Sequence, residues 1–382
     1  MPALAALALL AGCAGSGAGV ADIRPGERPP MTSDEAGLWM QMQRAEDQLR
    51  ASGALLRDAA LHTYVREVVC RLAADYCRDV RVYVVRRAGF NASMAPNGML
   101  VVWSGLLLRT ANEAQLAYVL GHEMGHYLKR HSLQMWRERR SRRAGAAIVG
   151  TMLDVALGGT GTAAVQSAVA GSLAAFSRET EREADELGLE AMAKAGYAPA
   201  EAARVWEQLL KEEKTAAGTA PSAFFPTHPP TEERLGALRE LAARTPAGDT
   251  PGKVGRDALL ATTGRLRAMF LGDELQQRRF AATQVLLDHL LAAGERPAEL
   301  QFFQGELYRL RNAADDGPRA IAAYRAALAL PDPPAESHRS LGVLLLRVGD
   351  RVGARAAFAG YLERKPDGDD AAMIRAQLRE LE

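Results

Sequence analysis

Two histidines with three residues between them, His122 and His126, constrain this chain more than any other feature, and Glu123 directly follows the first. On a helix, residues four apart lie on one face, so both imidazoles can bind one metal ion while Glu123 flanks it. A zinc ion held there lowers the pKa of its bound water, and a neighbouring carboxylate can take the proton. The spacing therefore predicts a hydrolytic site with one Zn²⁺ per chain and Glu123 as the general base.

The helix that carries this pattern is predicted from its own start signals. Thr110 is a suitable N-cap residue, and Glu113 follows three residues later, as in a capping box. Leu116, Val119 and Leu120 then form an apolar stripe at helical spacing. These signals favour a true helix over a chance match of the motif.

A catalytic zinc needs three protein ligands and one open position for water. Glu181 and Asp185 are four residues apart on one face of a predicted helix. We expect Glu181 to be the third ligand, and Asp185 to accept the second ring N–H of a zinc-binding histidine. Glu179 and Glu183 are expected to point elsewhere. His131, five residues after His126, is not assigned a role, and a direct role for it stays open as a minor alternative. The alternative is a solvated helix rich in Arg and Glu.

His228 is followed by Pro229 and Pro230, which exclude a helix at this point, so we expect it on a loop. A loop histidine at a zinc site could donate a hydrogen bond to the developing oxyanion, or it could occupy the open position and exclude water. Arg234 could support either arrangement by pairing with substrate or by orienting the loop. A histidine that only starts a surface helix is the third interpretation.

Three motifs in this order resemble a known family. They are His-Glu-x-x-His at 122–126, Ser-Arg-x-x-Glu-x-x-Ala-Asp at 177–185, and Thr-His-Pro-Pro at 227–230 followed by Arg234. They are similar to the HtpX and CAAX-prenyl-protease family of zinc metallopeptidases. The resemblance implies an α+β, mostly helical gluzincin-type domain at 36–245. A small antiparallel sheet would receive the peptide at its edge strand, and Asn91 would hold the substrate backbone.

The sheet also has a local signal. Val80, Val82 and Val84 alternate with Arg81 and Tyr83, which is typical of a strand. The segment 99–103 is a second β-rich run, and Pro-Asn-Gly at 96–98 favours a loop or hairpin before it. We expect a substrate to add an extra strand in this region.

The first residues suggest a membrane anchor. Residues 3–11 are small and apolar and lead to Leu-Ala-Gly-Cys, which looks like the lipobox of a bacterial lipoprotein signal at 1–13. Cys13 would carry the lipid, and 14–35 would be a tether. Ala14 lacks the inner-membrane retention signal, so we expect an outer-membrane anchor facing the periplasm. The missing Lys or Arg before the apolar run leaves an untargeted Ala-rich start as the alternative.

In the periplasm, Cys70 and Cys77 would be free to pair. Seven residues along an unbroken helix place two Cα atoms about 10 Å apart, which is beyond disulfide reach. A disulfide therefore requires the helix to end near Ala74. Metal binding by this pair is disfavoured because no His or third Cys lies near it in sequence.

Beyond a Pro- and Gly-rich linker at 246–256, residues 257–382 predict a helical tetratricopeptide-like repeat domain. Residues 259–291 form a weaker third unit. Stacked repeats of this kind leave a concave face that binds protein. The two clearer units match the repeat signature at Gly305, Tyr308, Ala320, Tyr324 and Ala327, and at Leu341, Gly342, Ala354, Phe358 and Pro366.

The composition, 24% charged and 48% hydrophobic over 382 residues, is typical of a globular protein. A net charge of +1 and the lack of a recognised motif give no reason to expect nucleic acid as a partner. The basic run at 129–143 favours a solvated face, with contact to anionic lipid as the alternative. The apolar segment 144–176 is interrupted by Asp154 and glycines, which favours buried or interfacial helices over a membrane span.

The leading hypothesis is a zinc endopeptidase that degrades misfolded or misassembled envelope proteins. Its partners would be polypeptide substrates and the outer-membrane protein assembly machinery, docked by the repeats, as the BepA-like branch of the family implies. A chaperone or assembly adaptor with latent proteolysis is the alternative. A hydrolase of lipid or cell-wall substrates would use the same zinc chemistry but would not need the repeats.

Overall fold

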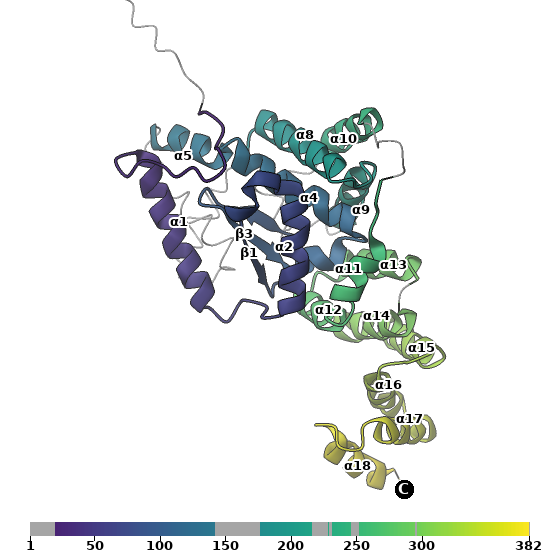
Figure 1. Cartoon of the computed structure of the whole chain (residues 1–382). Helices are drawn as coiled ribbons and strands as arrows, with labels where there is room; N and C mark the ends of the chain where they lie inside the picture. Colours follow the sequence, from purple (N-terminus) through teal and green to yellow (C-terminus); the bar gives the residue numbers. More distant parts are fainter. Residues whose placement is uncertain are drawn as a thin grey trace, which may run out of the picture.

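The computed structural model describes residues 20–141, 176–215, 228, 231–245, 252–294 and 296–381. Helices dominate, and they surround one small sheet in the N-terminal part of the chain. From α14 onwards the helices extend away from the rest of the molecule to the C-terminus (Figure 1). The predicted α+β, mostly helical class is confirmed.

The helices fall into two groups along the chain. Those around the sheet are α1 (Asp34–Ala51), α2 (Ala59–Ala73), α3 (Ser104–Arg109), α4 (Glu113–Leu128), α5 (His131–Ser141), α8 (Arg178–Lys194), α9 (Glu201–Thr215) and α10 (Glu232–Arg244). Those of the C-terminal part are α11 (Arg256–Thr263), α12 (Arg267–Gln276), α13 (Phe280–Ala292), α14 (Pro297–Arg311), α15 (Asp316–Leu328), α16 (Ala335–Arg347), α17 (Arg351–Arg364) and α18 (Ala371–Glu380).

The sheet is mixed, so the predicted antiparallel sheet is wrong. Its strands are β1 (Arg81–Val85), β2 (Ala92–Met94) and β3 (Met99–Trp103), in the order β1-β3-β2. The chain leaves β1, passes to the far side of β3, forms β2 there and turns back at 95–98. Strand β3 therefore runs antiparallel to β2 but parallel to β1. The three-residue strand β2 lies at the edge of the sheet.

Strand β3 is buried on both faces. Leu100 and Val102 belong to the core that includes α2 and α4, whereas Val101 and Trp103 pack with the apolar residues of α1. This alternation follows from the two-residue period of a strand, whose successive side chains point to opposite faces. The sheet is thereby held between helices on both sides, and α4 is fixed against it.

Helix α4, which carries the two histidines, starts later than its sequence predicts. Asn112 is the N-cap, and its side chain accepts a hydrogen bond from the Gln115 backbone N–H. Thr110 instead ends α3, because its N–H donates to the Leu106 carbonyl. The prediction of Thr110 as the N-cap is therefore wrong. Helix α3 ends only a few residues before α4 begins, so Thr110, a suitable N-cap residue, ends α3 and Asn112 caps α4.

Helices α4 and α8 approach each other at glycines. A Cβ added to Gly188 would lie 2.7 Å from the His122 backbone nitrogen, and one added to Gly125 would lie 3.0 Å from the Ala184 Cα atom. Real Cβ atoms essentially never come as close to backbone as 2.7 Å, and a contact at 3.0 Å is tighter than most, so larger residues would force the helices apart. The glycines thus set the distance between the helix with the two histidines and the helix with Glu181.

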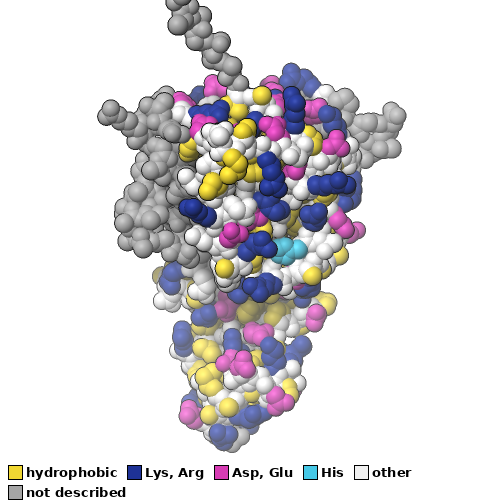
Figure 2. Space-filling view, turned by 60° about the vertical axis from the view of Figure 1, so that its left-hand side comes forward, with side chains coloured by type: hydrophobic (Ala, Val, Ile, Leu, Met, Phe, Trp, Pro, Cys, Tyr) yellow, Lys and Arg dark blue, Asp and Glu magenta, His cyan; other side chains and the backbone are white. Residues whose placement is uncertain are grey.

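Part of the basic run at 129–143 forms ion pairs with acidic residues near the start of the chain. Neither interpretation of the run, a solvated face or a lipid contact, included such ion pairs. The pairs are Lys129 with Asp22 (3.1 Å), Arg130 with Glu35 (2.6 Å) and Arg137 with Asp34 (2.9 Å). These contacts hold the N-terminal segment over the junction of α4 and α5. On the face drawn in Figure 2, Lys and Arg side chains are scattered among Asp and Glu.

Cys70 and Cys77 form a disulfide in the structure, with Cα atoms 4.7 Å apart. Helix α2 ends at Ala73, and Ala74 has a positive φ of 46°. A short 3-10 helix, Ala74–Arg78, then brings Cys77 back towards α2. The end of the helix near Ala74 thus removes the separation that an unbroken helix would impose.

In the C-terminal part, consecutive helices approach each other closely at small residues. A Cβ added to Gly342 of α16 would lie 2.6 Å from the Phe358 ring of α17, so the glycine admits the aromatic ring. The segment before these helices is bound to the N-terminal part, since Lys253 N–H donates to the Gly196 carbonyl (2.8 Å).

None of the described helices is long and apolar enough to span a bilayer. Cys13 and the segment 142–175, which contains most of the predicted apolar stretch, lie outside the described residues.

Candidate metal centre

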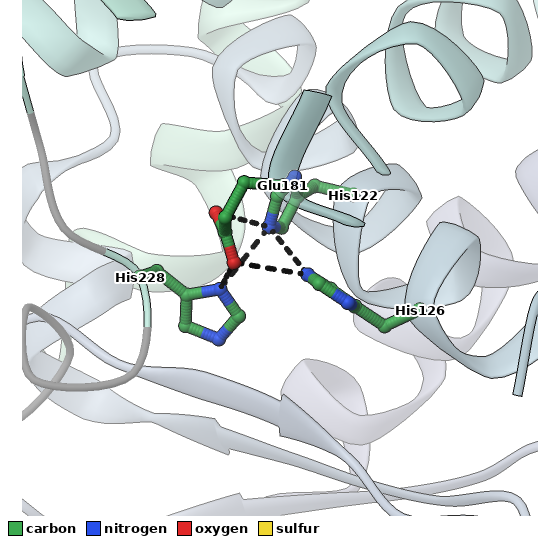
Figure 3. Close-up of side chains that lie close together, drawn as sticks. All are labelled: His122, His126, Glu181 and His228. Carbon is green, nitrogen blue, oxygen red and sulfur yellow. Dashed lines mark hydrogen bonds and ion pairs between the residues drawn. The ribbon is translucent and has the colours of Figure 1, made fainter. Parts of the chain in front are cut away.

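Four buried side chains from three parts of the chain converge on one point (Figure 3). His122 and His126 come from α4, Glu181 from α8, and His228 from a bend shortly before α10 in the chain. Each offers one ligand atom, and these atoms all lie within 4.8 Å of one another. The two histidines and Glu181, predicted as ligands from the sequence, are thus brought together.

The distances within the cluster are those of groups that share a central ion. His122 Nε2 lies 3.1 Å from His126 Nε2, and Glu181 Oε1 lies 3.4 Å from His126 Nε2. His228 Nδ1 is 2.8 Å from the same carboxylate oxygen. Three imidazole nitrogens and a carboxylate oxygen are ligands that zinc takes in tetrahedral sites. The donor set therefore fits one metal ion.

Asp185 fixes the ring of His122. Its Oδ1 lies 2.9 Å from His122 Nδ1, so the ring proton lies on Nδ1 and Nε2 is free to face the cluster. Tyr118 O–H also donates to Oδ1 (2.7 Å). Burial raises the pKa of Asp185, but the charge and hydrogen bonds of Arg234 outweigh burial and lower it to about 2. Asp185 is therefore ionised, as the supporting role predicted for it requires.

Arg234 takes a role that neither sequence hypothesis described. Its guanidinium donates two hydrogen bonds to Asp185 (2.7 and 2.6 Å) and forms an ion pair with Glu181 (2.5 Å). It also lies over the Trp206 ring, 4.4 Å from the centroid. Arg234 thus neutralises the two buried acids of α8 and holds them towards the histidines.

Glu123 is close to the cluster but is not among its four ligand residues. Its Oε2 accepts a hydrogen bond from the Met94 N–H of β2 (3.1 Å), and its Oε1 lies 3.6 Å from His228 Nε2. Burial raises the pKa of Glu123. A carboxylate in this position is a base beside the metal site, tied to the edge strand.

Residues 55–242 match the model of peptidase family M48. The chain belongs to peptidase family M48. This finding confirms the family expected from the three motifs. Metallopeptidases of family M48 are zinc-dependent, and the four convergent ligands suit one metal ion.

Named relatives of this M48 chain include two bacterial proteases and a mitochondrial one. A putative beta-barrel assembly-enhancing protease of Vibrio cholerae is 31% identical over 208 residues, 52% of this chain and 42% of that protein. The beta-barrel assembly-enhancing protease of Escherichia coli is 29% identical over 206 residues, which are 51% of this chain and 42% of that protein. Mitochondrial metalloendopeptidase OMA1 of Saccharomyces cerevisiae is 32% identical over 149 residues, which are 38% of this chain and 41% of that protein. The matches span less than half the length of these relatives.

Asn91 lies directly before β2 and is not one of the four ligand residues of the M48 site. Its carbonyl accepts a hydrogen bond from the Trp103 N–H (3.0 Å), which continues the pairing of β2 with β3. Its side-chain Nδ2 is buried and has no hydrogen-bond partner among the described residues. The substrate-binding role of Asn91 remains a prediction.

The sequence interpretation missed two residues beside the M48 site. His131 Nδ1 lies 2.9 Å from His126 Nδ1, and Glu183 Oε2 lies 3.0 Å from His131 Nε2. Glu183 does point away from the metal ligands, as expected, but it reaches His126 through His131. The contact depends on Arg130, whose left-handed φ of 54° turns α5 back over α4. The sequence does not signal that turn, because position 130 holds Arg and not Gly or Asn, the residues that most readily adopt a positive φ.

Proposed function

We propose that this protein is a zinc-dependent endopeptidase that cleaves polypeptides of the bacterial cell envelope. The observation that carries the proposal is the buried cluster of four ligands with Glu123 beside it, joined by a hydrogen bond to the edge strand of the sheet. A zinc ion bound there would polarise the scissile carbonyl and lower the pKa of a water molecule. The relatives named above are proteases and a metalloendopeptidase.

Glu123 is the proposed general base. It is one residue from a ligand on α4 yet is not a ligand itself, so its carboxylate is available to take a proton. Burial raises its pKa, which makes it a stronger base than an exposed glutamate. The hydrogen bond from Met94 N–H orients Oε2 and leaves Oε1 directed towards the cluster.

The edge strand β2 is the proposed place for the substrate backbone. Among the described residues, β2 pairs only with β3, so the rest of its other edge, beyond the Met94 N–H that donates to Glu123, can form main-chain hydrogen bonds with an extended peptide. Because Met94 of this strand bonds Glu123, a peptide added to β2 would run past the base. Binding through the backbone suits substrates of many sequences.

His228 is proposed to hold the site in a resting state. Of the two roles considered for it, the arrangement seen resembles occupation of the fourth position, since Nδ1 lies 3.3 Å from His122 Nε2 and 2.8 Å from Glu181 Oε1. A site closed by four protein ligands has no position for substrate or water. His228 would therefore have to leave the cluster before hydrolysis.

The cell envelope is proposed as the place of action. The lipobox-like sequence ending at Cys13 supports an outer-membrane anchor, and the Cys70–Cys77 disulfide suits an oxidising compartment such as the periplasm. The C-terminal helices are proposed to be tetratricopeptide-like repeats that dock substrates or the outer-membrane protein assembly machinery. Two relatives are named for beta-barrel assembly.

The location is tested by fractionation of cells that express the wild type or Cys13→Ser. We expect the wild type in the membrane fraction and the variant in the soluble periplasmic fraction. A wild-type protein that is soluble in the periplasm would contradict the lipid anchor.

A chaperone or assembly adaptor with latent proteolysis is the second candidate. The closed set of four ligands favours it, since such a site hydrolyses nothing until His228 moves. In that case the protein would support assembly of outer-membrane proteins equally well with and without Glu123.

One experiment separates the two candidates. Envelope proteins are compared by mass spectrometry in cells that carry the wild type, Glu123→Gln, or the control Glu179→Gln, whose side chain is not among the metal ligands. A peptidase predicts intact substrates that accumulate only with Glu123→Gln. Identical envelope proteomes in all three strains would favour the adaptor.

A further inference from the structure

His131 contacts the metal ligand His126, and unlike a surface histidine it is buried. His131 is 1% exposed, although it is the first residue of α5 and follows a turn. The left-handed conformation of Arg130 folds α5 back, so that the His131 ring meets His126 in the last turn of α4. Arg130 is itself held by an ion pair to Glu35 (2.6 Å).

The protons of this contact can be assigned from the distances. His126 faces the cluster with Nε2, so a metal-binding ring carries its proton on Nδ1. That nitrogen lies 2.9 Å from His131 Nδ1, which must then be the acceptor. The proton of a neutral His131 is consequently on Nε2, where it donates to Glu183 Oε2 at 3.0 Å. One arrangement satisfies both rings.

We propose that His131 and Glu183 form a relay that positions His126 on the metal. The relay would hold the His126 ring with Nε2 towards the ion, and it would pass part of the Glu183 charge to that ring. Outer partners of metal-binding histidines fix the tautomer and raise ligand basicity. His131 is therefore a positioning residue, because it acts through His126.

Two further contacts define the surroundings of the relay. The Phe176 ring stacks on the His126 ring at 4.0 Å between centroids, with 25° between the planes, so it covers one face of the imidazole. The hydrogen bond to His131 then fixes rotation within that plane. At the outer end, Glu183 also pairs with Lys129 (3.2 Å), which holds the carboxylate in place.

The decisive measurement is zinc affinity, by competition with a chelator, for purified wild type, His131→Phe and His131→Asn. Phenylalanine keeps a ring but accepts no hydrogen bond, whereas asparagine can accept from His126. We expect affinity to fall by about 10- to 100-fold in His131→Phe and to be largely restored in His131→Asn. The melting temperatures of the two metal-free variants should be alike.

An unchanged affinity in His131→Phe would overturn the relay. So would an equal loss in both variants that follows a drop in metal-free melting temperature, since this is the result of a purely structural contact. The proposal rests on the zinc site of the proposed function but not on peptide hydrolysis. A wild type that binds no zinc would refute that site, whereas the relay alone fails if wild type and His131→Phe bind zinc equally.

The role of Glu183 is tested by a double-mutant cycle. Glu183→Gln should weaken zinc binding several-fold, and the exposed neighbour Glu186→Gln, a matched control on α8, should not. In the His131→Phe background, Glu183→Gln should have no additional effect, because the charge then has no path to His126. Independent, additive losses from the two substitutions would contradict the relay.

Discussion

The part around the sheet and the C-terminal helices differ in the side chains that they bury. In the part around the sheet, α4 buries His122, Glu123 and His126 with 1–2% exposure, and every one of them has a charged or polar neighbour. In the C-terminal part, most contacts between helices are made by Ala, Leu, Gly and aromatic residues, such as Gly342 against Phe358, and the polar groups buried among them, such as Glu306, are paired with other residues of the chain. Burying polar groups is costly unless each is paired. The part around the sheet buries ionisable groups at the metal centre, where each of them is paired.

The difference divides the expected effects of substitution. Changes at the metal centre should alter zinc binding or turnover and leave folding largely intact. Changes among the C-terminal helices should alter stability and leave the metal centre unaffected. Each prediction below tests one side of this division, beginning with the largest expected effect.

Glu123→Gln should reduce turnover of a peptide substrate by about 10³-fold while zinc content stays at that of the wild type. Glutamine can still accept the Met94 hydrogen bond but cannot take a proton, and general bases contribute about 10²–10⁴-fold. Turnover and zinc content are measured on the same preparation. Substantial turnover by the variant would remove Glu123 from its role.

Glu181→Ala should weaken zinc binding by more than about 100-fold, because it removes a ligand and leaves Arg234 without one of its two acids. Glu183→Ala should weaken binding less, through His131, and Glu179→Ala should have no measurable effect. Chelator competition gives the three affinities. Equal losses in all three variants would show that general charge on α8, not ligation, holds the metal.

Gly342→Leu should destabilise the C-terminal part by about 2–3 kcal/mol, because its side chain would meet the Phe358 ring. Thermal unfolding measures this effect, and hydrolysis of a short peptide should remain unchanged. Gly317→Leu is the matched control, since a Cβ added at Gly317 meets nothing within 4 Å. A loss of zinc in Gly342→Leu would break the proposed division between the two parts.

His228→Ala should raise turnover by about tenfold, which corresponds to removing a bias of about 1.4 kcal/mol towards the closed site. Zinc should remain bound through the three other ligands. A fall of about 10²-fold would instead assign His228 to oxyanion stabilisation. If neither turnover nor zinc content changes, His228 has neither role.

Glu306→Gln tests the acid that α14, α15 and α16 share. Burial raises the pKa of Glu306, but hydrogen bonds from Arg309, Tyr324 and Ser340 outweigh burial and lower it. A lowered pKa stabilises the folded state above the usual value of 4.5, and this contribution is lost as the pH falls below that value. Denaturant unfolding should therefore show a deficit of about 1 kcal/mol in the variant at pH 7, which shrinks towards pH 3. A deficit that is the same at both pH values would contradict the assignment.

Local spacing predicted the parts of the site that lie within one helix. His122 with His126, and Glu181 with Asp185, are each four residues apart, so the helical period alone places each pair on one face. The meeting of the two pairs was expected because the site lacked a third ligand and because the motifs that contain the pairs resemble those of a zinc metallopeptidase family. The structure shows that glycines on both helices bring them together.

The remaining features depend on contacts between distant segments. Strand β2 has only three residues and gains its identity from pairing with β3, so its period-two signal is too short to recognise. The parallel pairing of β1 with β3 depends on the path between strands. Likewise, the role of Arg234 depends on its approach to α8, and that of His131 depends on the left-handed Arg130.

The attachment of residues 252–255 to α4 decides where the protein can be divided into fragments. The carbonyls of Val254 and Gly255 accept hydrogen bonds from the N–H groups of Ala114 (3.0 Å) and Glu113 (3.3 Å), in the first turn of the zinc-site helix. Such N–H groups have no partner within their own helix. A truncated peptidase that ends before Val254 would lose these acceptors, so the shortest useful fragment extends beyond Gly255. Exchange of the C-terminal helices between relatives should begin after the same residue.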